Sequence, residues 1–212
     1  MTPEAPPPDP GRWEPLALDE VAALLEGCTA PWWIAGGYAI DAFVGDFARR
    51  PHEDVDVGLL ARDQVAIRDC LAGWDLQCAD PPGHLRPWPV GELLEEPIHD
   101  IWARESPGAP WRIQLMLNPA TANAWVYRRD RRITRRLAEL VHRVSGIPYL
   151  AAEVQLLFKA TTGRDKDEQD FRDALPSLDA GQCGWLGWAL ELAHPHHPWL
   201  ALLEPGAVRR DL

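Results

Sequence analysis

Two acidic residues two positions apart, Asp54 and Asp56, are the pair in this 212-residue sequence from which chemistry follows most directly. Successive side chains of a strand point to opposite faces, so if Val55 and Val57 face the core, both carboxylates project from the other face. Neighbouring carboxylates repel each other unless a cation or a basic partner lies beside them. Carboxylate oxygens suit Mg²⁺, which commonly joins one or two carboxylates to the phosphates of a substrate. The pair therefore predicts a magnesium site for a nucleoside triphosphate.

The glycine doublet Gly36-Gly37 is the second feature, and Asp54 follows Gly37 by seventeen positions. Backbone N–H groups at a glycine turn that opens a helix are unpaired and carry the positive end of the helix dipole, so they attract phosphate oxygens. Each motif alone has an ordinary structural interpretation, a tight turn or a strand edge. On consecutive strands with one helix and a basic loop between them, they predict both halves of a nucleotide site.

The elements that must position these residues alternate between strand and helix, as judged from hydrophobic periodicity and breaker residues. Helices are predicted over residues 19–27, 38–44, 64–71, 150–160, 166–175 and 181–193. Strands are predicted over residues 32–35, 54–60, 74–78, 85–88, 99–102, 111–117 and 125–129. This order predicts a mixed sheet followed by a helical region.

Length and composition fit one main domain with a smaller one attached. The chain is 46% hydrophobic and 25% charged, which is ordinary for a globular protein and excludes a disordered chain. We expect a loose, Pro-rich arm at residues 1–15, a main α/β domain at residues 16–146 and a helical cap at residues 147–212.

The formal net charge of -11 argues against nucleic acid or an anionic membrane as a partner, because such binding requires Lys and Arg to neutralise phosphates. It suits a cationic small molecule. Arginines cluster over residues 128–136, where a solvated basic face is favoured over an anion site. No apolar run approaches the ~20 residues of a membrane span. The four cysteines form no C-x-x-C pattern and no signal sequence opens the chain, so we expect a cytoplasmic protein.

Two segments carry a resemblance to a known family. Residues 33–41 (WIAGGYAID) and 50–57 (RPHEDVDV) resemble the glycine motif, basic loop and Asp-x-Asp strand of the polymerase-beta-like nucleotidyltransferases. They are most similar to the small enzymes that nucleotidylylate aminoglycoside and lincosamide antibiotics. Residues 154–160 and 166–171 resemble the first cap helices of that family, so the resemblance covers most of residues 32–175.

The resemblance implies an α/β (α+β) nucleotidyltransferase fold, with a mixed central sheet flanked by helices and a C-terminal helical cap. It implies Mg²⁺ bound by Asp54 and Asp56, and transfer of a nucleoside monophosphate from a nucleoside triphosphate to a hydroxyl group. ATP is the expected donor, and a small, cationic acceptor such as an aminoglycoside is the expected partner.

The resemblance also assigns nucleotide contacts. Gly36 and Gly37 would cradle the phosphates, and Arg50 and His52 would hold triphosphate oxygens. Lys159 and Lys166 would approach the nucleotide from the cap, although single lysines near helix ends are usually only solvated.

A third carboxylate on a neighbouring central strand completes the site in that family, and here the sequence departs from it. The matching strand presents Gln114, whose carbonyl binds metal weakly and which cannot take a proton. Asp100, on the expected hairpin partner strand, is the candidate replacement, since neighbouring strands bring side chains within about 5 Å. A solvent-facing Asp100 is the competing interpretation. The alternative function is a catalytically impaired binding module or an antitoxin-like protein; a structural interaction protein ranks last.

Overall fold

The structure is a computed structural model that describes residues 11–204, and these residues form two compact units. Unit 1 contains the described residues up to Trp32 and Glu53–Asn118. Unit 2 contains Trp33–His52 and the described residues from Pro119 onward. Each unit therefore combines segments that are distant in the sequence. Of the predicted arm, residues 1–10 lie outside the described part of the chain, and the predicted domain boundaries remain predictions.

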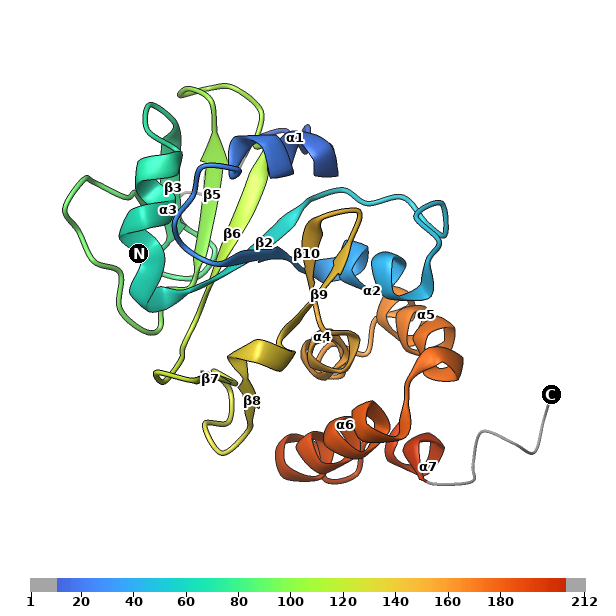
Figure 1. Ribbon diagram of the computed structural model, residues 1–212. Coiled ribbons are helices and arrows are strands. Elements are labelled where there is room, and N and C mark those ends of the chain that lie inside the picture. The colour runs from blue at the N-terminus through green and yellow to red at the C-terminus, as the bar shows by residue number, and fades with distance from the viewer. Residues whose placement is uncertain (1–10, 205–212) are drawn as a thin grey trace, which may run out of the picture. The chain divides into compact units, whose positions relative to one another are not determined.

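Unit 1 is built on a mixed sheet (Figure 1). Its strands, in the spatial order β4-β3-β5-β6-β2, are β2 (Asp56–Leu60), β3 (Asp75–Ala79), β4 (Leu85–Pro87), β5 (Asp100–Arg104) and β6 (Ile113–Asn118). Strands β2 and β6 are parallel, and the other neighbouring pairs are antiparallel. The helices of this unit are α1 (Leu18–Leu24) and α3 (Gln64–Cys70), with the short 3-10 turn η1 (Ala61–Asp63) before α3.

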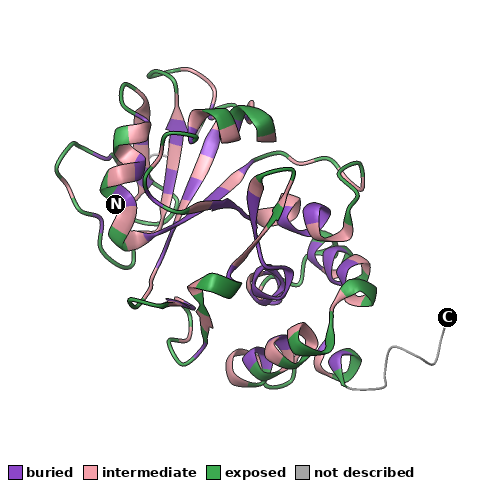
Figure 2. Ribbon diagram, viewed as in Figure 1, coloured by how far each residue is buried: buried purple, intermediate pink, exposed green. Residues whose placement is uncertain are grey.

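Alternation along the strands separates a buried face of this sheet from a half-exposed one (Figure 2). The apolar side chains of the buried face are fully enclosed, among them Val57, Leu59, Ile101, Ile113 and Leu115. The residues between them on β5 and β6 are only half-buried. Burial of the apolar set fixes the register, because a slip of one residue would turn every side chain to the opposite face.

Residues 12–16 run beside the start of β6. Glu14 N–H donates to the Trp111 carbonyl at 3.0 Å, and Leu16 N–H donates to the Arg112 carbonyl at 3.0 Å. The Trp13 ring packs edge-on against Trp102, with ring centroids 5.0 Å apart. This segment is thus paired with unit 1 along its backbone.

Unit 2 carries most of β1 (Trp32–Ile34), which is parallel to β10 (Ile147–Leu150), and β10 is antiparallel to β9 (Val141–Val144). A separate hairpin joins β7 (Ala124–Val126) and β8 (Thr134–Arg136). The helices are α2 (Gly36–Val44), α4 (Ala152–Lys159), α5 (Asp165–Ala174), α6 (Ala180–Ala193) and α7 (Leu200–Leu203), with 3-10 turns η2 (Leu137–Glu139) and η3 (Leu175–Ser177).

The predicted fold class, a mixed sheet flanked by helices, is confirmed. The sequence did not predict β8, β9, β10 or α7. Residues 147–150, expected at the start of the helical cap, form β10 instead. A short apolar run beside a helix has no periodicity of its own that identifies it as a strand. Among the described residues, no helix is long and apolar enough to cross a membrane.

Asp179 caps the N-terminus of α6 in unit 2. Asp179 precedes α6, and its Oδ1 accepts a hydrogen bond from Gln182 N–H at 2.8 Å. The Gln182 side chain returns the contact by accepting from Asp179 N–H at 3.0 Å. These two bonds satisfy N–H groups that a helix start otherwise leaves unpaired.

We predict that Asp179→Ala lowers the free energy of unfolding by about 1 kcal/mol, because the Gln182 N–H loses its acceptor. Urea denaturation measures the change. Glu191→Ala, an exposed site near the end of the same helix, is the matched control and should change stability little. Equal effects of the two substitutions would contradict a stabilising cap.

Candidate functional site

The Asp-x-Asp motif lies at the start of β2 in unit 1. Val55 and Val57 are fully buried, whereas Asp54 is exposed and Asp56 half-buried. The predicted alternation is therefore present. The strand begins at Asp56 rather than at Asp54, but the Gln114 N–H donates to the Val55 carbonyl at 3.0 Å, so Val55 is held against β6.

Asp56, Gln114 and Asp100 lie on three adjacent strands, β2, β6 and β5. Asp56 is the register partner of Gln114. Asp100 pairs in register with Met116, two residues from Gln114, which places Asp100 diagonally beside Gln114 on the same half-exposed face. The Gln114 side-chain amide donates to Asp100 Oδ1 at 3.4 Å, and His99 Nε2 lies 3.5 Å from Asp100 Oδ2. Both contacts are long, so the Asp100 carboxylate is held loosely.

The donor chemistry of this face fits magnesium. Asp54, Asp56 and Asp100 offer carboxylate oxygens and Gln114 an amide oxygen, all hard ligands. Within residues 11–204 no three His, Cys, Asp or Glu side chains are grouped closely enough to hold a metal ion by themselves. Mg²⁺ commonly keeps several waters and completes its shell with substrate phosphates, so two carboxylates can be sufficient.

The glycine turn lies in unit 2, where it opens α2. Gly36 has φ of 67°, a left-handed conformation that side chains disfavour. Its N–H is not free, because it donates to Gln155 Oε1 on α4 at 2.8 Å. At Gly37 a Cβ atom would overlap the Arg50 guanidinium and the His52 ring. The turn is thus covered by two of the basic residues expected to hold phosphate.

Asp41, one helical turn after Gly37, is fully buried and binds the basic loop that follows α2. Its Oδ1 accepts from Arg49 Nη2 at 2.8 Å and from Arg49 Nε at 3.2 Å. Its Oδ2 lies 2.5 Å from His52 Nε2. The His52 ring also packs on Tyr38, with ring centroids 3.9 Å apart.

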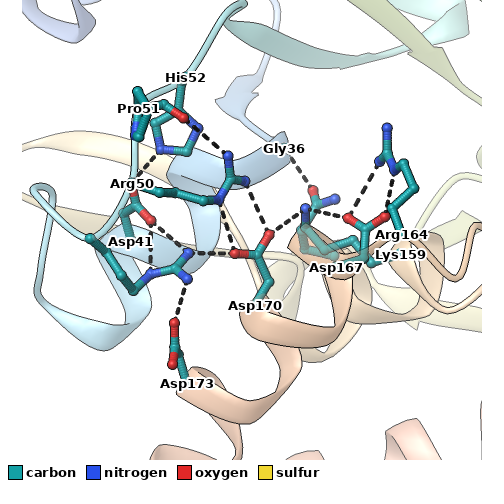
Figure 3. A network of polar contacts seen from close by, with 12 residues as sticks. Gly36, Asp41, Arg50, Pro51, His52, Lys159, Arg164, Asp167, Asp170 and Asp173 are labelled. Carbon is teal, nitrogen blue, oxygen red and sulfur yellow. Dashed lines mark hydrogen bonds and ion pairs between the residues drawn. The ribbon is translucent and has the colours of Figure 1, made fainter.

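Asp170 on α5 is the second fully buried carboxylate of this network (Figure 3). It contacts Arg49 Nη2 at 2.6 Å and Arg50 Nη2 at 3.1 Å. Lys159 Nζ, from α4, lies 2.6 Å from Asp170 Oδ2. Three cations therefore converge on one side chain.

Lys159 is itself buried and has a second acidic contact, Asp167 Oδ1 at 3.1 Å. Asp167 also accepts hydrogen bonds from Arg164 Nε at 2.7 Å and from the Thr162 hydroxyl. Lys166, by contrast, is exposed in the first turn of α5. The structure thus gathers Gly36, Gly37, Arg50, His52 and Lys159 in one region of unit 2 and leaves Lys166 on its surface.

Two carboxylates of this network, Asp167 and Asp170, are held in the charged form. Burial by itself would raise the pKa of Asp170, but hydrogen bonds from Arg50 and Arg49 and the charge of Lys159 lower it to about 2. Burial would likewise raise the pKa of Asp167, and the hydrogen bond from Arg164 outweighs it, so the pKa is lowered. Burial lowers the pKa of Arg49, yet hydrogen bonds to Asp170 and Asp173 leave it above its usual range. All of these groups are ionised at neutral pH.

Sequence reasoning did not identify Gln155 as the partner of the Gly36 amide or Asp170 as the centre of the basic cluster. Gln155 is a single polar residue in a helix whose neighbours are buried and apolar, and that isolation was the available signal. Asp170 stands among other acids in a highly charged helix, so nothing in its sequence environment distinguished it.

Comparison with known proteins places the chain near one group. Residues 17–78 match the family model of aminoglycoside-2''-adenylyltransferase, a segment that includes both the glycine doublet and the Asp-x-Asp motif. Among curated proteins, none matches the chain.

Two solved structures of ANT(2'')-Ia have the same fold as this chain. A crystal structure in complex with adenylyl-2''-tobramycin is 14% identical, with a TM-score of 0.54 over 82% of this chain and 95% of that one. A solution structure, of an antibiotic-resistance factor with substrate-regulated conformation dynamics, is 17% identical, with a TM-score of 0.52 over 85% and 96%. The resemblance to small aminoglycoside nucleotidyltransferases that the sequence predicted is therefore confirmed, and the chain has their fold.

We predict that Gly37→Ala lowers the free energy of unfolding by about 1–3 kcal/mol. The added methyl group meets Arg50 and His52, whose side chains are tied to Asp170 and Asp41 and cannot move aside without breaking those contacts. Thermal or urea unfolding measures the loss.

Gly184→Ala is the matched control, since a Cβ atom there meets nothing within 4 Å and alanine favours a helix. Unchanged stability of Gly37→Ala would contradict the placement of Arg50 and His52 over the turn.

Proposed function

We propose that this protein is a Mg²⁺-dependent nucleotidyltransferase that moves a nucleoside monophosphate from a nucleoside triphosphate, with ATP as the expected donor, to a hydroxyl of a small acceptor. One observation carries the proposal: Asp56 and Asp100 share the half-exposed face of three adjacent strands, and Asp56 opens the strand next to Gln114. The family-model match over residues 17–78 and the fold of ANT(2'')-Ia support it.

Asp54 and Asp56 would hold Mg²⁺, which when bound supplies neutralisation of the triphosphate charge. Asp100 would accept the proton of the acceptor hydroxyl as its oxygen attacks the α-phosphorus and pyrophosphate leaves. Gly36 and Gly37 belong to the proposed triphosphate-binding region, together with Arg50, His52, Lys159 and Lys166. Among Arg50, His52 and Lys159, the Arg50 side chain is the most exposed. It is 19% exposed, against 5% for His52 and 6% for Lys159. It is therefore best placed to reach a phosphate.

A cationic acceptor such as an aminoglycoside is part of the proposal. The chain has a net charge of -11, and attraction between opposite charges increases the rate of encounter with a positively charged ligand. Around Asp100 the face also carries the half-buried Trp102, whose ring packs edge-on against Trp111 with centroids 5.5 Å apart. Aromatic faces attract cations.

The second candidate is a binding module without transferase activity. Gln114, at the position where the family resemblance expects a carboxylate, is the observation that favours it, because an amide cannot accept the proton. The two candidates agree on nucleotide binding and differ on turnover.

We expect pyrophosphate release when the protein is incubated with Mg²⁺, a nucleoside triphosphate and an acceptor. Each of the four common triphosphates is tested with a panel of aminoglycosides, a lincosamide and uncharged sugars, and the acceptor is analysed by mass spectrometry for an added nucleoside monophosphate. Omission of Mg²⁺ is the control. Binding of a triphosphate by calorimetry without turnover on any acceptor would favour the binding module, and neither binding nor turnover would overturn the proposal.

We predict that Asp100→Asn lowers kcat by about 10²–10⁴-fold with little change in KM for the triphosphate, because only the proton acceptor is lost. Asp56→Asn should also lower turnover, and higher Mg²⁺ should restore part of it. Glu105→Gln, exposed just after β5, is the matched control and should behave as the unaltered protein. Unchanged turnover of Asp100→Asn would remove Asp100 from the reaction.

A further inference from the structure

Asp170 forms ion pairs with three basic side chains. Arg49 and Arg50 reach it from the loop after α2, and Lys159 reaches it from α4. Asp170 has no exposed surface. Its carboxylate therefore joins three elements of unit 2 at one buried point.

This arrangement is costly to build, so stability alone explains it poorly. Removing a carboxylate and an ammonium group from water costs free energy that their mutual attraction often only offsets, and apolar replacements can be as stable. A buried ion pair does fix the positions of its two side chains, because each charge is compensated only when it lies beside its partner. The positions in which Asp170 fixes its basic partners are therefore the feature to explain.

The group whose placement Asp170 determines is Arg50. Asp170 binds one edge of the Arg50 guanidinium through Nε at 3.2 Å and Nη2 at 3.1 Å. Among residues 11–204, the remaining nitrogen, Nη1, has one polar contact, of 3.3 Å, to the Pro51 carbonyl. Beneath the guanidinium lies Gly37, where no side chain intervenes. One edge is thus anchored while the other keeps donor capacity for a ligand.

Lys159 contributes on the other side of Asp170. Its side chain is only 6% exposed, and it forms ion pairs with two buried carboxylates, Asp167 and Asp170. It compensates the charge of Asp170 and fixes the position of that carboxylate, which in turn sets the position of Arg50.

We propose that Asp170 is a positioning residue for the nucleotide: it holds Arg50 over the glycine turn so that the guanidinium edge that Asp170 does not bind contacts the polyphosphate. The inference rests on the proposed nucleotidyltransferase function and extends it to a residue that does not touch the substrate. Arg50 donates to the phosphate oxygens, and Asp170 acts only through Arg50.

The test is a double-mutant cycle of Asp170→Asn and Arg50→Gln, with KM and kcat measured for the MgATP-dependent transfer and the Kd of MgATP measured by calorimetry. We expect Asp170→Asn to raise KM and Kd for MgATP about tenfold or more, the size of one lost charge-assisted contact, with kcat changed less than threefold. In the Arg50→Gln background the same substitution should have little further effect on KM, because coupled residues are not additive.

Asp165→Asn, an exposed acid at the start of the same helix, is the matched control and should leave KM and kcat unchanged. Asp170→Glu keeps the charge and is expected to fold if Asp170→Asn does not. It displaces the carboxylate by one methylene, so it should raise KM in the same direction by a smaller factor.

A lower melting temperature with an unchanged KM for both Asp170 variants would overturn the inference and leave Asp170 a structural anchor. Equal KM effects with and without Arg50 would also overturn it. If either result is found while the unaltered protein turns over, the proposed function stands and only the positioning role of Asp170 fails. Absence of both MgATP binding and turnover in the unaltered protein overturns the function and the inference together.

Discussion

Two carboxylates without contact to water, Asp41 and Asp170, hold together the part of unit 2 that surrounds the glycine turn. Arg49 bridges them, with contacts of 2.8 Å to Asp41 and 2.6 Å to Asp170. Loss of one member would leave a buried charge unpaired, which is far more costly than keeping the set complete. The basic loop therefore has one favourable arrangement. This loop, which contains Arg49, Arg50 and His52, ends two positions before Asp54 in the sequence. The first proposed metal ligand therefore follows it closely.

In unit 1 the position of the acidic face follows from the core beneath it. Val57 on β2, Leu115 on β6 and Ile101 on β5 are all fully buried, and each can be buried only if its neighbours in the strand face outward. Those neighbours include Asp56, Gln114 and Asp100. The same apolar contacts that stabilise the sheet thus select the side chains that stand together on its other face.

The sequence predicted the local features and not the long-range partners. Alternation around Val55 and the breaker pair at Gly36 are properties of neighbouring residues, so the strand and the helix after it were predictable. The Gly36 N–H acceptor lies 119 positions away and the Arg50 acceptor 120 positions away. Which acid of a highly charged helix becomes buried depends on the elements that pack on it, and periodicity does not contain that information. For the same reason the strands β8 to β10, three or four residues each, were not predicted.

The two acids beside Gln114 give a physical reason for a neutral residue at that position. It stands in register with Asp56 on one side and lies diagonally beside Asp100 on the other. A third carboxylate at that point would repel both acids. The amide is neutral, and its N–H donates toward Asp100 Oδ1 at 3.4 Å. In the proposed reaction, a neutral donor at this position therefore adds no further negative charge between Asp100, the proposed base, and Asp56, a proposed metal ligand.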